Sequence, residues 1–360
     1  MAGAGQRLGE LMASRRILII GPSWVGDMVM AQTLFKVLRQ QHPDCDIDVL
    51  APRWSLPLLE RMPQVRRGLS MPLGHGQLQL GVRRRLGFDL RQQDYDQAIV
   101  LPNSLKSALI PFFADIPVRT GWRGEMRYGL LSDVRVLDKQ KYPLMVERFV
   151  ALAYEPAAVL PKPILWPALE VDVESAQAVY GEKVLAQARV GQKVLALCPG
   201  AEFGPAKRWP DQHYAALAAD YLARGWRVVL MGSAKDSDVA ECIRSTLAPD
   251  AQGDCINLCG KTSLGEAIDI LSQVDAVVSN DSGLMHIAAA LQRPLVVVYG
   301  STSPGFTPPL AEVVAIEQIP VDCGPCFKRE CPLGHMKCLV DLEPGRVIAS
   351  LDRLLDAVEG

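Results

Sequence analysis

The chain lacks a long hydrophobic run. Hydrophobic residues make up 49% of its 360 residues, yet no stretch approaches the ~18 continuous apolar residues that a membrane-spanning helix needs. The first 16 residues also lack the apolar segment of a secretory signal. These absences predict a cytoplasmic protein. Because thiols stay reduced there, we expect the nine cysteines to be free thiols or metal ligands rather than disulfides.

Two common nucleotide-binding motifs are missing as well. Residues 21–27, directly after the first apolar run, read Gly-Pro-Ser-Trp-Val-Gly-Asp, which is not the G-x-G-x-x-G of a dinucleotide-binding fold. The two glycines have the spacing of a P-loop, but Asp27 and Met28 stand where that motif needs Lys and Ser or Thr. A carboxylate there would repel a triphosphate, so the sequence argues against an ATPase.

Asp-x-Asp pairs, which often hold Mg²⁺ on nucleotide sugars, occur only in places unsuited to that role. The pairs at 44–46, 46–48 and 94–96 come before apolar runs, at the amino edge of the expected sheet. Ligands of open α/β sheets bind beyond the carboxyl ends of the strands. The sequence therefore predicts no catalytic metal site and no cofactor.

The cysteine-rich segment near the C-terminus leaves two interpretations open. Cys323, Cys326, Cys331 and Cys338 form C-x2-C-x4-C-x6-C, with His335 inside. The first pair has zinc-like spacing, whereas the remaining spacing is tighter than in usual zinc ribbons. Both a structural metal site and a metal-free loop fit this pattern.

Charge is distributed unevenly between the two halves. The net charge is −2, but residues 1–165 carry 22 Lys and Arg against 15 Asp and Glu. A basic N-terminal half suits an anionic partner, and an acidic C-terminal half argues against a nucleic-acid groove that crosses both halves. Undirected drift of surface charge explains the asymmetry equally well.

Short apolar runs alternate with amphipathic stretches in two passes along the chain. The expected strands are 16–20, 47–51, 97–101, one near Val118, 193–198, 227–231, 256–258, 276–279 and 295–299, and the expected helices are 26–41, 209–224, 237–248, 264–274, 282–291 and 345–358. This alternation predicts parallel sheets with helices on both faces.

The two passes predict two Rossmann-like α/β domains whose parallel sheets face each other across a central cleft. We expect domains at 1–170 and 171–360, joined in or just after the Pro-rich stretch 156–167. The final helix, 345–358, packs either on its own domain or back on the N-terminal one.

Three motifs follow expected strands and would lie at the cleft. Asp27 stands where a helix begins, so it can cap that helix, and a capping Asp can also act as a base. In residues 280–286, Asn-Asp-Ser-Gly-Leu-Met-His, Ser282 and Gly283 open a helix whose free N–H groups attract phosphate. The alternative is a capped core helix with an internally satisfied His286, which the Ser-Gly pair with a following His on the same face argues against. Lys207 follows the loop 199–206 and could neutralise a pyrophosphate, or merely flank a helix in solvent.

Together these motifs resemble glycosyltransferase family nine, the ADP-heptose lipopolysaccharide heptosyltransferases. The matching features are G-x4-G-D at residue 21, K-R-W at 207, N-D-S-G-L-M-H at 280 and C-G-P-C-F-K-R-x-C at 323, and the similarity runs over nearly all of residues 16–357. The resemblance implies a GT-B fold and metal-independent, inverting transfer of L-glycero-D-manno-heptose from ADP-heptose to the first heptose of the lipopolysaccharide inner core.

The resemblance also implies roles for individual residues. Asp27 would be the catalytic base, with Lys207 assisting catalysis. The donor site would comprise Gly204, Lys207, Thr262, Asp281, Ser282, Gly283 and His286, and the acceptor site Gly26, Asp27, Asn103 and Arg123. Further arginines that could meet acidic groups of the acceptor are Arg66, Arg67, Arg83, Arg84, Arg85, Arg119 and Arg127.

The implied partners are ADP-heptose and an anionic lipopolysaccharide inner-core acceptor at the surface of the inner membrane, with no nucleic acid. A peripheral position at the inner face of that membrane is therefore compatible with the sequence. The alternatives are a heptosyltransferase of another core position, another GT-B nucleotide-sugar enzyme such as an epimerase, and a non-catalytic nucleotide-sugar-binding protein. A cleft-facing Asp27 favours an enzyme, because binding alone requires no carboxylate there.

Overall fold

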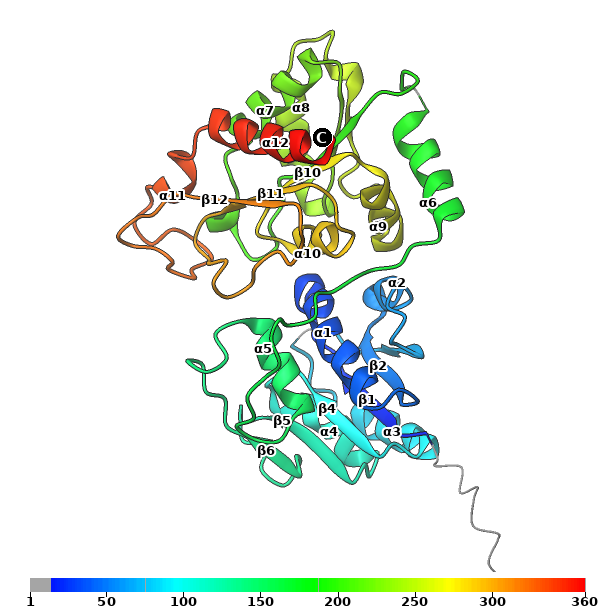
Figure 1. Cartoon of the computed structure of the whole chain (residues 1–360). Coiled ribbons are helices and arrows are strands. Elements are labelled where there is room, and N and C mark those ends of the chain that lie inside the picture. The colour runs from blue at the N-terminus through cyan, green and yellow to red at the C-terminus, as the bar shows by residue number, and fades with distance from the viewer. Residues whose placement is uncertain (1–13, 75, 187, 360) are drawn as a thin grey trace, which may run out of the picture.

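Two lobes make up the fold, and each is built on a wholly parallel sheet of six strands (Figure 1). The computed structural model describes residues 14–74, 76–186 and 188–359. The N-terminal strands are β1 (Arg16–Ile20), β2 (Asp46–Pro52), β3 (Arg67–Met71), β4 (Gln97–Val100), β5 (Val118–Trp122) and β6 (Asp133–Arg135). The C-terminal strands are β7 (Val194–Cys198), β8 (Arg227–Leu230), β9 (Cys255–Asn257), β10 (Ala276–Asn280), β11 (Leu295–Tyr299) and β12 (Val314–Gln318).

Both sheets have the same doubly wound order. The N-terminal order is β3-β2-β1-β4-β5-β6, and the C-terminal order is β12-β11-β10-β7-β8-β9. The order in which strands are added therefore reverses between β1 and β4 in one sheet and between β7 and β10 in the other. Ligands of such sheets bind beyond the carboxyl ends of the strands at the point of this reversal. The site is therefore expected beyond the ends of these four strands.

Helices cover both sheets. They are α1 (Val25–Gln41), α2 (Leu56–Leu59), α3 (Leu80–Leu90), α4 (Leu105–Phe113) and α5 (Met145–Val150) in the N-terminal lobe, and α6 (Val173–Tyr180), α7 (Asp211–Ala223), α8 (Ser237–Thr246), α9 (Leu264–Gln273), α10 (Gly283–Ala290), α11 (Lys337–Val340) and α12 (Pro344–Glu359) in the C-terminal lobe. Strands covered on both faces read as continuous apolar runs, and β7, β10 and β11 are buried along their whole length. No helix in the described ranges is both long and apolar enough to cross a membrane.

The two lobes touch along one side of the cleft. Helix α1 packs against α10, and α2 packs against α9, as Figure 1 shows at the boundary between the lobes. An ion pair joins Arg61 to Asp269 across this boundary at 2.5 Å. The side-chain amide of Gln32 exchanges two hydrogen bonds with the backbone of Ala168, which fastens the connecting segment to α1.

The structure confirms the expected α/β fold of two parallel sheets and corrects some of its details. Strands β3, β6 and β12 were not expected from the sequence. All three lie at sheet edges, where they are only partly buried, so they lack the continuous apolar pattern of inner strands. Helix α12 packs on α7, β11 and β12 of the C-terminal lobe; the alternative that it packs back on the N-terminal lobe was wrong.

Candidate active site

The N-termini of two helices meet where the lobes touch. Helix α1 follows β1, and α10 follows β10, so both begin at the carboxyl edge of their sheets. A Cβ atom on Gly26 would lie 2.6 Å from Cδ2 of His286, and one on Gly283 would lie 2.7 Å from Cβ of Val25. Only glycine permits this approach. Because the N-terminus of a helix carries partial positive charge, the meeting point favours an anionic ligand.

Asp27 lies in the first turn of α1, beside this meeting point. The N-cap residue of the helix is Trp24, and no side chain caps it, so the interpretation of Asp27 as a helix cap was wrong. Burial raises the pKa of Asp27 to about 6; the cation of Lys207 opposes this rise and the carboxylate of Asp281 adds to it. Asp27 is therefore ionised at neutral pH, yet its pKa is close enough to 7 for efficient proton transfer.

Lys207 and Asp281 form the charged pair of the C-terminal lobe. Lys207 ends a short 3-10 turn after β7, and its Nζ donates a hydrogen bond of 2.6 Å to Oδ2 of Asp281. The Thr302 hydroxyl donates to the same carboxylate oxygen. Asp281 is buried and would repel a phosphate, so its position suits a residue that holds Lys207 in place rather than one that binds the donor directly.

His286 and Ser282 flank the start of α10. Ser282 is the N-cap residue of α10, as the sequence predicted. His286 is buried, and burial lowers its pKa to about 4. The imidazole is therefore neutral at pH 7, and it lies against Gly26 of the other lobe. A neutral imidazole can form a hydrogen bond with a ligand but contributes no charge to phosphate binding.

Gly204 and Thr262 occupy different positions along the same edge. Gly204 has φ +152°, and a Cβ there would lie 2.5 Å from the Arg329 carbonyl oxygen. The Ala206 amide donates to that same oxygen, so the cysteine-rich segment supports the Lys207 loop. Thr262 follows β9, two strands away from β7, which is a lateral distance of about 10 Å.

A pocket of about 820 Å³ opens at the carboxyl edge of the N-terminal sheet. Its polar lining includes Ser23, Arg53, Ser104 and Lys106, and Trp54 contributes an aromatic surface. Sequence reasoning missed Arg53, Trp54 and Lys106, although Arg53 and Trp54 directly follow β2 and Lys106 follows β4. Because they come shortly after strands, at the carboxyl edge of the sheet, their place in the sequence could have identified them as pocket residues.

Asn103 and Arg123 lie beside this pocket rather than in its lining. Both are exposed, and they follow β4 and β5 in adjacent loops. The side-chain oxygen of Asn103 accepts a hydrogen bond from Arg127. A Cβ on Gly124 would lie 2.2 Å from the Asn103 carbonyl oxygen, so the two loops pack closely together.

Most of the arginines proposed as acceptor ligands are occupied within the fold. Arg66 and Arg67 pair with Asp48 at the amino edge of the sheet, far from the pocket mouth. Arg127 is buried and donates to the carbonyl oxygens of Pro102 and Trp122. Two others also donate to backbone carbonyls: Arg83 and Arg119. That interpretation was therefore wrong for Arg66, Arg67, Arg119 and Arg127. Arg83 lines the pocket, and Arg84, Arg85 and Arg123 remain without an ion pair in the described part of the chain.

The Asp-x-Asp pairs and the cysteine-rich segment are the two sequence features that were considered for metal binding. Asp46 and Asp48 pair with Arg66. Near the C-terminus, Sγ of Cys323 lies 3.9 Å from Nε2 of His335. Across residues 14–74, 76–186 and 188–359, no group of three or more His, Cys, Asp or Glu side chains is arranged to hold a metal ion.

Comparison with known proteins agrees with this geometry. The family model described as glycosyltransferase family 9 (heptosyltransferase) matches residues 83–337. Lipopolysaccharide heptosyltransferase 2 of Salmonella typhimurium is 51% identical over 94% of this chain and 98% of its own length. Lipooligosaccharide heptosyltransferase 2 of Haemophilus influenzae is also 51% identical, over 94% of this chain and 99% of its own.

A solved structure extends the match to three dimensions. The structure of Escherichia coli ADP-heptose lipopolysaccharide heptosyltransferase II superimposes with a TM-score of 0.87 at 47% identity, covering 96% of this chain and all of that one. A family 9 glycosyltransferase from Veillonella parvula has the same fold, with a TM-score of 0.81 at 18% identity. The chain belongs to glycosyltransferase family 9, the heptosyltransferase family.

Proposed function

We propose that the chain is an inverting heptosyltransferase that moves L-glycero-D-manno-heptose from ADP-heptose to the first heptose of the lipopolysaccharide inner core. The observation that carries this proposal is Asp27, a carboxylate with its pKa raised to about 6 opposite the Lys207–Asp281 pair of the other lobe. The names of the relatives at 51% identity support the choice of donor sugar and acceptor.

The donor pyrophosphate binds at the start of α10. The first N–H groups of a helix have no partner within the helix, so the amides near Ser282 and Gly283 point toward a bound phosphate. Lys207 carries the only full positive charge that we assign to this position. Its ammonium has three N–H donors, so it can keep its bond to Asp281 and still bind a phosphate oxygen. Gly204, Thr262 and His286 complete the donor site around the sugar and nucleotide.

The acceptor binds on the N-terminal side of the cleft, along the pocket that contains Arg53, Trp54 and Lys106. Gly26, Asn103 and Arg123 border the same side. Arg53 and Lys106 suit the acidic groups of an inner-core oligosaccharide, and the Trp54 ring offers a flat apolar surface to a sugar ring.

Transfer is a single displacement. Asp27 accepts the proton of the acceptor hydroxyl as its oxygen attacks the anomeric carbon, and the bond from that carbon to the ADP oxygen breaks on the opposite face. This in-line geometry inverts the configuration at the anomeric carbon. The sugar passes through an oxocarbenium-like state, while Lys207 and the α10 amides stabilise the charge that grows on departing ADP.

Release of ADP with and without the acceptor tests this proposal. A transferase releases one ADP per heptose added and only in the presence of an acceptor that already carries the first heptose. An epimerase would convert the donor without any acceptor, and a binding protein would release nothing. Transfer to an inner core that lacks the first heptose would indicate another core position instead.

A further inference from the structure

The outer surface of α3 and α4 combines exposed apolar and cationic side chains. We call this surface the α3–α4 face and define it by Leu78, Leu80, Arg84, Arg85, Phe88 and Phe112. Leu78 and Leu80 are 53% and 52% exposed, and Phe88 and Phe112 are 39% and 40% exposed. Large apolar side chains gathered in this way on a protein surface mark an interaction site.

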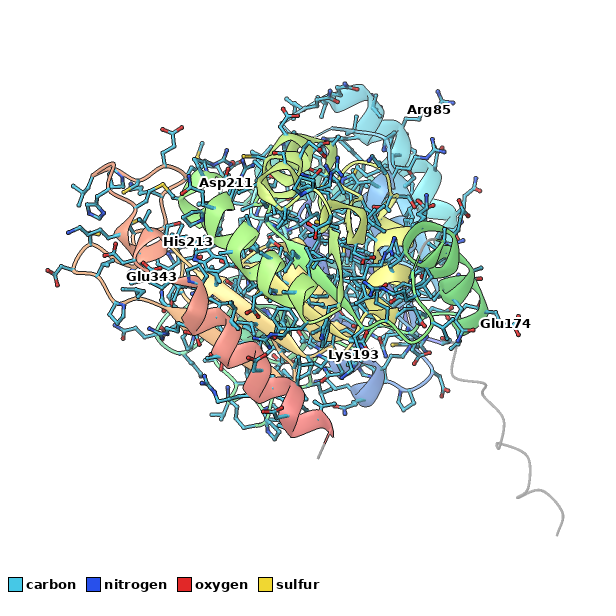
Figure 2. The ribbon with its side chains drawn as sticks, turned by 90° about the horizontal axis from the view of Figure 1, so that it is seen from above. Arg85, Glu174, Lys193, Asp211, His213 and Glu343 are labelled. Carbon is cyan, nitrogen blue, oxygen red and sulfur yellow. The ribbon has the colours of Figure 1, made fainter. Side chains whose placement is uncertain are left out.

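The residues of the face that belong to α3 lie on neighbouring sides of that helix. Leu80, Arg84 and Phe88 are four residues apart, so they follow one another along one side of the helix. Arg85 is adjacent, and Figure 2 shows its side chain pointing away from the body of the molecule. The buried Arg83 donates hydrogen bonds to the carbonyl oxygens of Gln77 and Leu78, which holds the segment before the helix in place.

Contacts between rings and guanidinium groups make the face continuous from α3 to α4. The guanidinium carbons of Arg84 and Arg91 lie 5.1 and 4.6 Å from the Phe88 ring centre. Phe113 joins Phe88 to Phe112 through edge-to-face contacts at 6.4 and 5.6 Å. The guanidinium carbon of Arg119 lies 5.7 Å from the centre of the Phe112 ring.

The charges of the face are available to a partner. Within the described part of the chain, neither Arg84 nor Arg85 forms an ion pair. The exposed carboxylate on α3 is Asp89, so cations are in excess on this helix. A second copy of the chain would bring like charges together across a two-fold interface, which disfavours self-association.

The face also adjoins the acceptor pocket. Gly74 and Gly76, just before α3, line the pocket, as do Arg83 of α3 and Lys106 of α4. In Figure 1, α3 lies at the end of the N-terminal lobe that is remote from the C-terminal lobe. A surface bound through this face would therefore lie beside the pocket mouth and leave the donor lobe free.

We propose that the α3–α4 face binds the surface of an anionic phospholipid membrane. Leucine and phenylalanine side chains enter the headgroup region, and arginines contact lipid phosphates, as in interfacial helices that lie in the membrane plane. This proposal depends on the proposed function in one respect: the membrane contact serves to bring a membrane-anchored acceptor to the pocket. Binding itself requires neither donor nor acceptor.

Vesicle co-sedimentation of the full-length protein tests this inference. The probes are vesicles of phosphatidylethanolamine with about 30% phosphatidylglycerol, and vesicles of phosphatidylcholine alone. We expect the wild-type protein to bind the anionic vesicles, and added salt to weaken this binding. Arg84→Gln/Arg85→Gln should bind at least ~10-fold more weakly, because each cation near such a surface raises the affinity about fivefold. Leu78→Gln/Leu80→Gln should also bind at least ~10-fold more weakly.

A matched control comes from the C-terminal lobe. Arg189 and Lys235 have side chains that are 71% and 72% exposed, so Arg189→Gln/Lys235→Gln removes the same charge elsewhere and should leave binding unchanged. Failure of the wild-type protein to bind anionic vesicles, or equal binding by all three variants, would overturn the proposal. So would a dimer in sedimentation velocity that Leu78→Gln/Leu80→Gln dissociates.

Turnover with a delipidated acceptor separates this proposal from the proposed function. Leu78→Gln/Leu80→Gln should transfer heptose to such an acceptor at the wild-type rate, because neither leucine is assigned to catalysis or to acceptor binding. Loss of vesicle binding with normal turnover supports the membrane surface. Vesicle binding by a protein without any turnover would refute the proposed function and leave the membrane surface standing.

Discussion

Replacing Asp27 by asparagine separates its chemical role from its structural one. Asparagine has the same shape, but its carboxamide does not accept a proton at neutral pH. If Asp27 is the general base, kcat should fall by about 10²-fold or more, while ADP affinity stays nearly constant. Steady-state kinetics with ADP-heptose and a heptosylated acceptor, together with ADP titration, measure the two effects.

The same substitution should make the protein more stable at neutral pH. Burial raises the pKa of Asp27 from 3.8 to about 6, a difference worth up to about 3 kcal/mol of folding free energy. A carboxylate in the first turn of a helix recovers roughly 0.3–1 kcal/mol through the helix dipole. The net gain in Asp27→Asn should therefore be about 2 kcal/mol.

The gain should depend on pH in a defined direction. The folded-state pKa of Asp27 lies above its unfolded-state value, so the wild-type protein loses stability as pH rises from about 4 to 6. Urea unfolding should show the two proteins equally stable below pH 4 and separated by the full difference above pH 7. Glu174→Gln is the matched control, because Glu174 lies in the first turn of α6 on the surface (Figure 2) and should change neither property.

Two outcomes would refute this reasoning about Asp27. Turnover within a few-fold of wild type in well-folded Asp27→Asn would end the assignment of Asp27 as the base. Equal stability of the two proteins at pH 7.5 would show that Asp27 is not desolvated.

Three further changes test the donor side and the contact between the lobes. Lys207→Ala should raise the donor KM and lower kcat strongly, because a charge-assisted phosphate contact is lost; unchanged values would remove Lys207 from the site. Gly26→Ala puts a methyl group 2.6 Å from Cδ2 of His286 and should lower kcat/KM by about 10²-fold with circular dichroism unchanged, whereas near-normal kinetics would show that the two helix ends need not meet. Turnover should persist in excess EDTA, since Asp46 and Asp48 are paired with Arg66; loss of activity that Mg²⁺ restores would contradict this.

Sequence reasoning identified the inner strands because their surroundings leave a clear pattern. β1, β7 and β11 are buried between helix layers, so their residues are almost all apolar. β3 and β12 lie at sheet edges, are only partly buried and mix polar with apolar residues, a pattern that turns and loops share. The missed β3 also matters for the site, because Ser70 and Met71 at its end line the acceptor pocket.

The cleft residues could be placed from the sequence because they directly follow inner strands. Their partners could not, because these pairings join distant parts of the chain: Lys207 meets Asp281 across 74 residues. Arginine partners were equally hidden. Charge alone predicted that Arg66 and Arg127 were available to an acceptor, whereas neighbouring carboxylates and backbone carbonyls occupy them.

The configuration of the transferred sugar tests the central claim most directly. Wild-type protein, ADP-heptose and a heptosylated inner-core acceptor should give a product whose new glycosidic bond, followed by proton NMR from the first turnovers, has the opposite anomeric configuration to the donor. One ADP should appear for each new bond, and none without acceptor. A product with retained configuration, or ADP release independent of the acceptor, would contradict single displacement by a hydroxyl that Asp27 deprotonates.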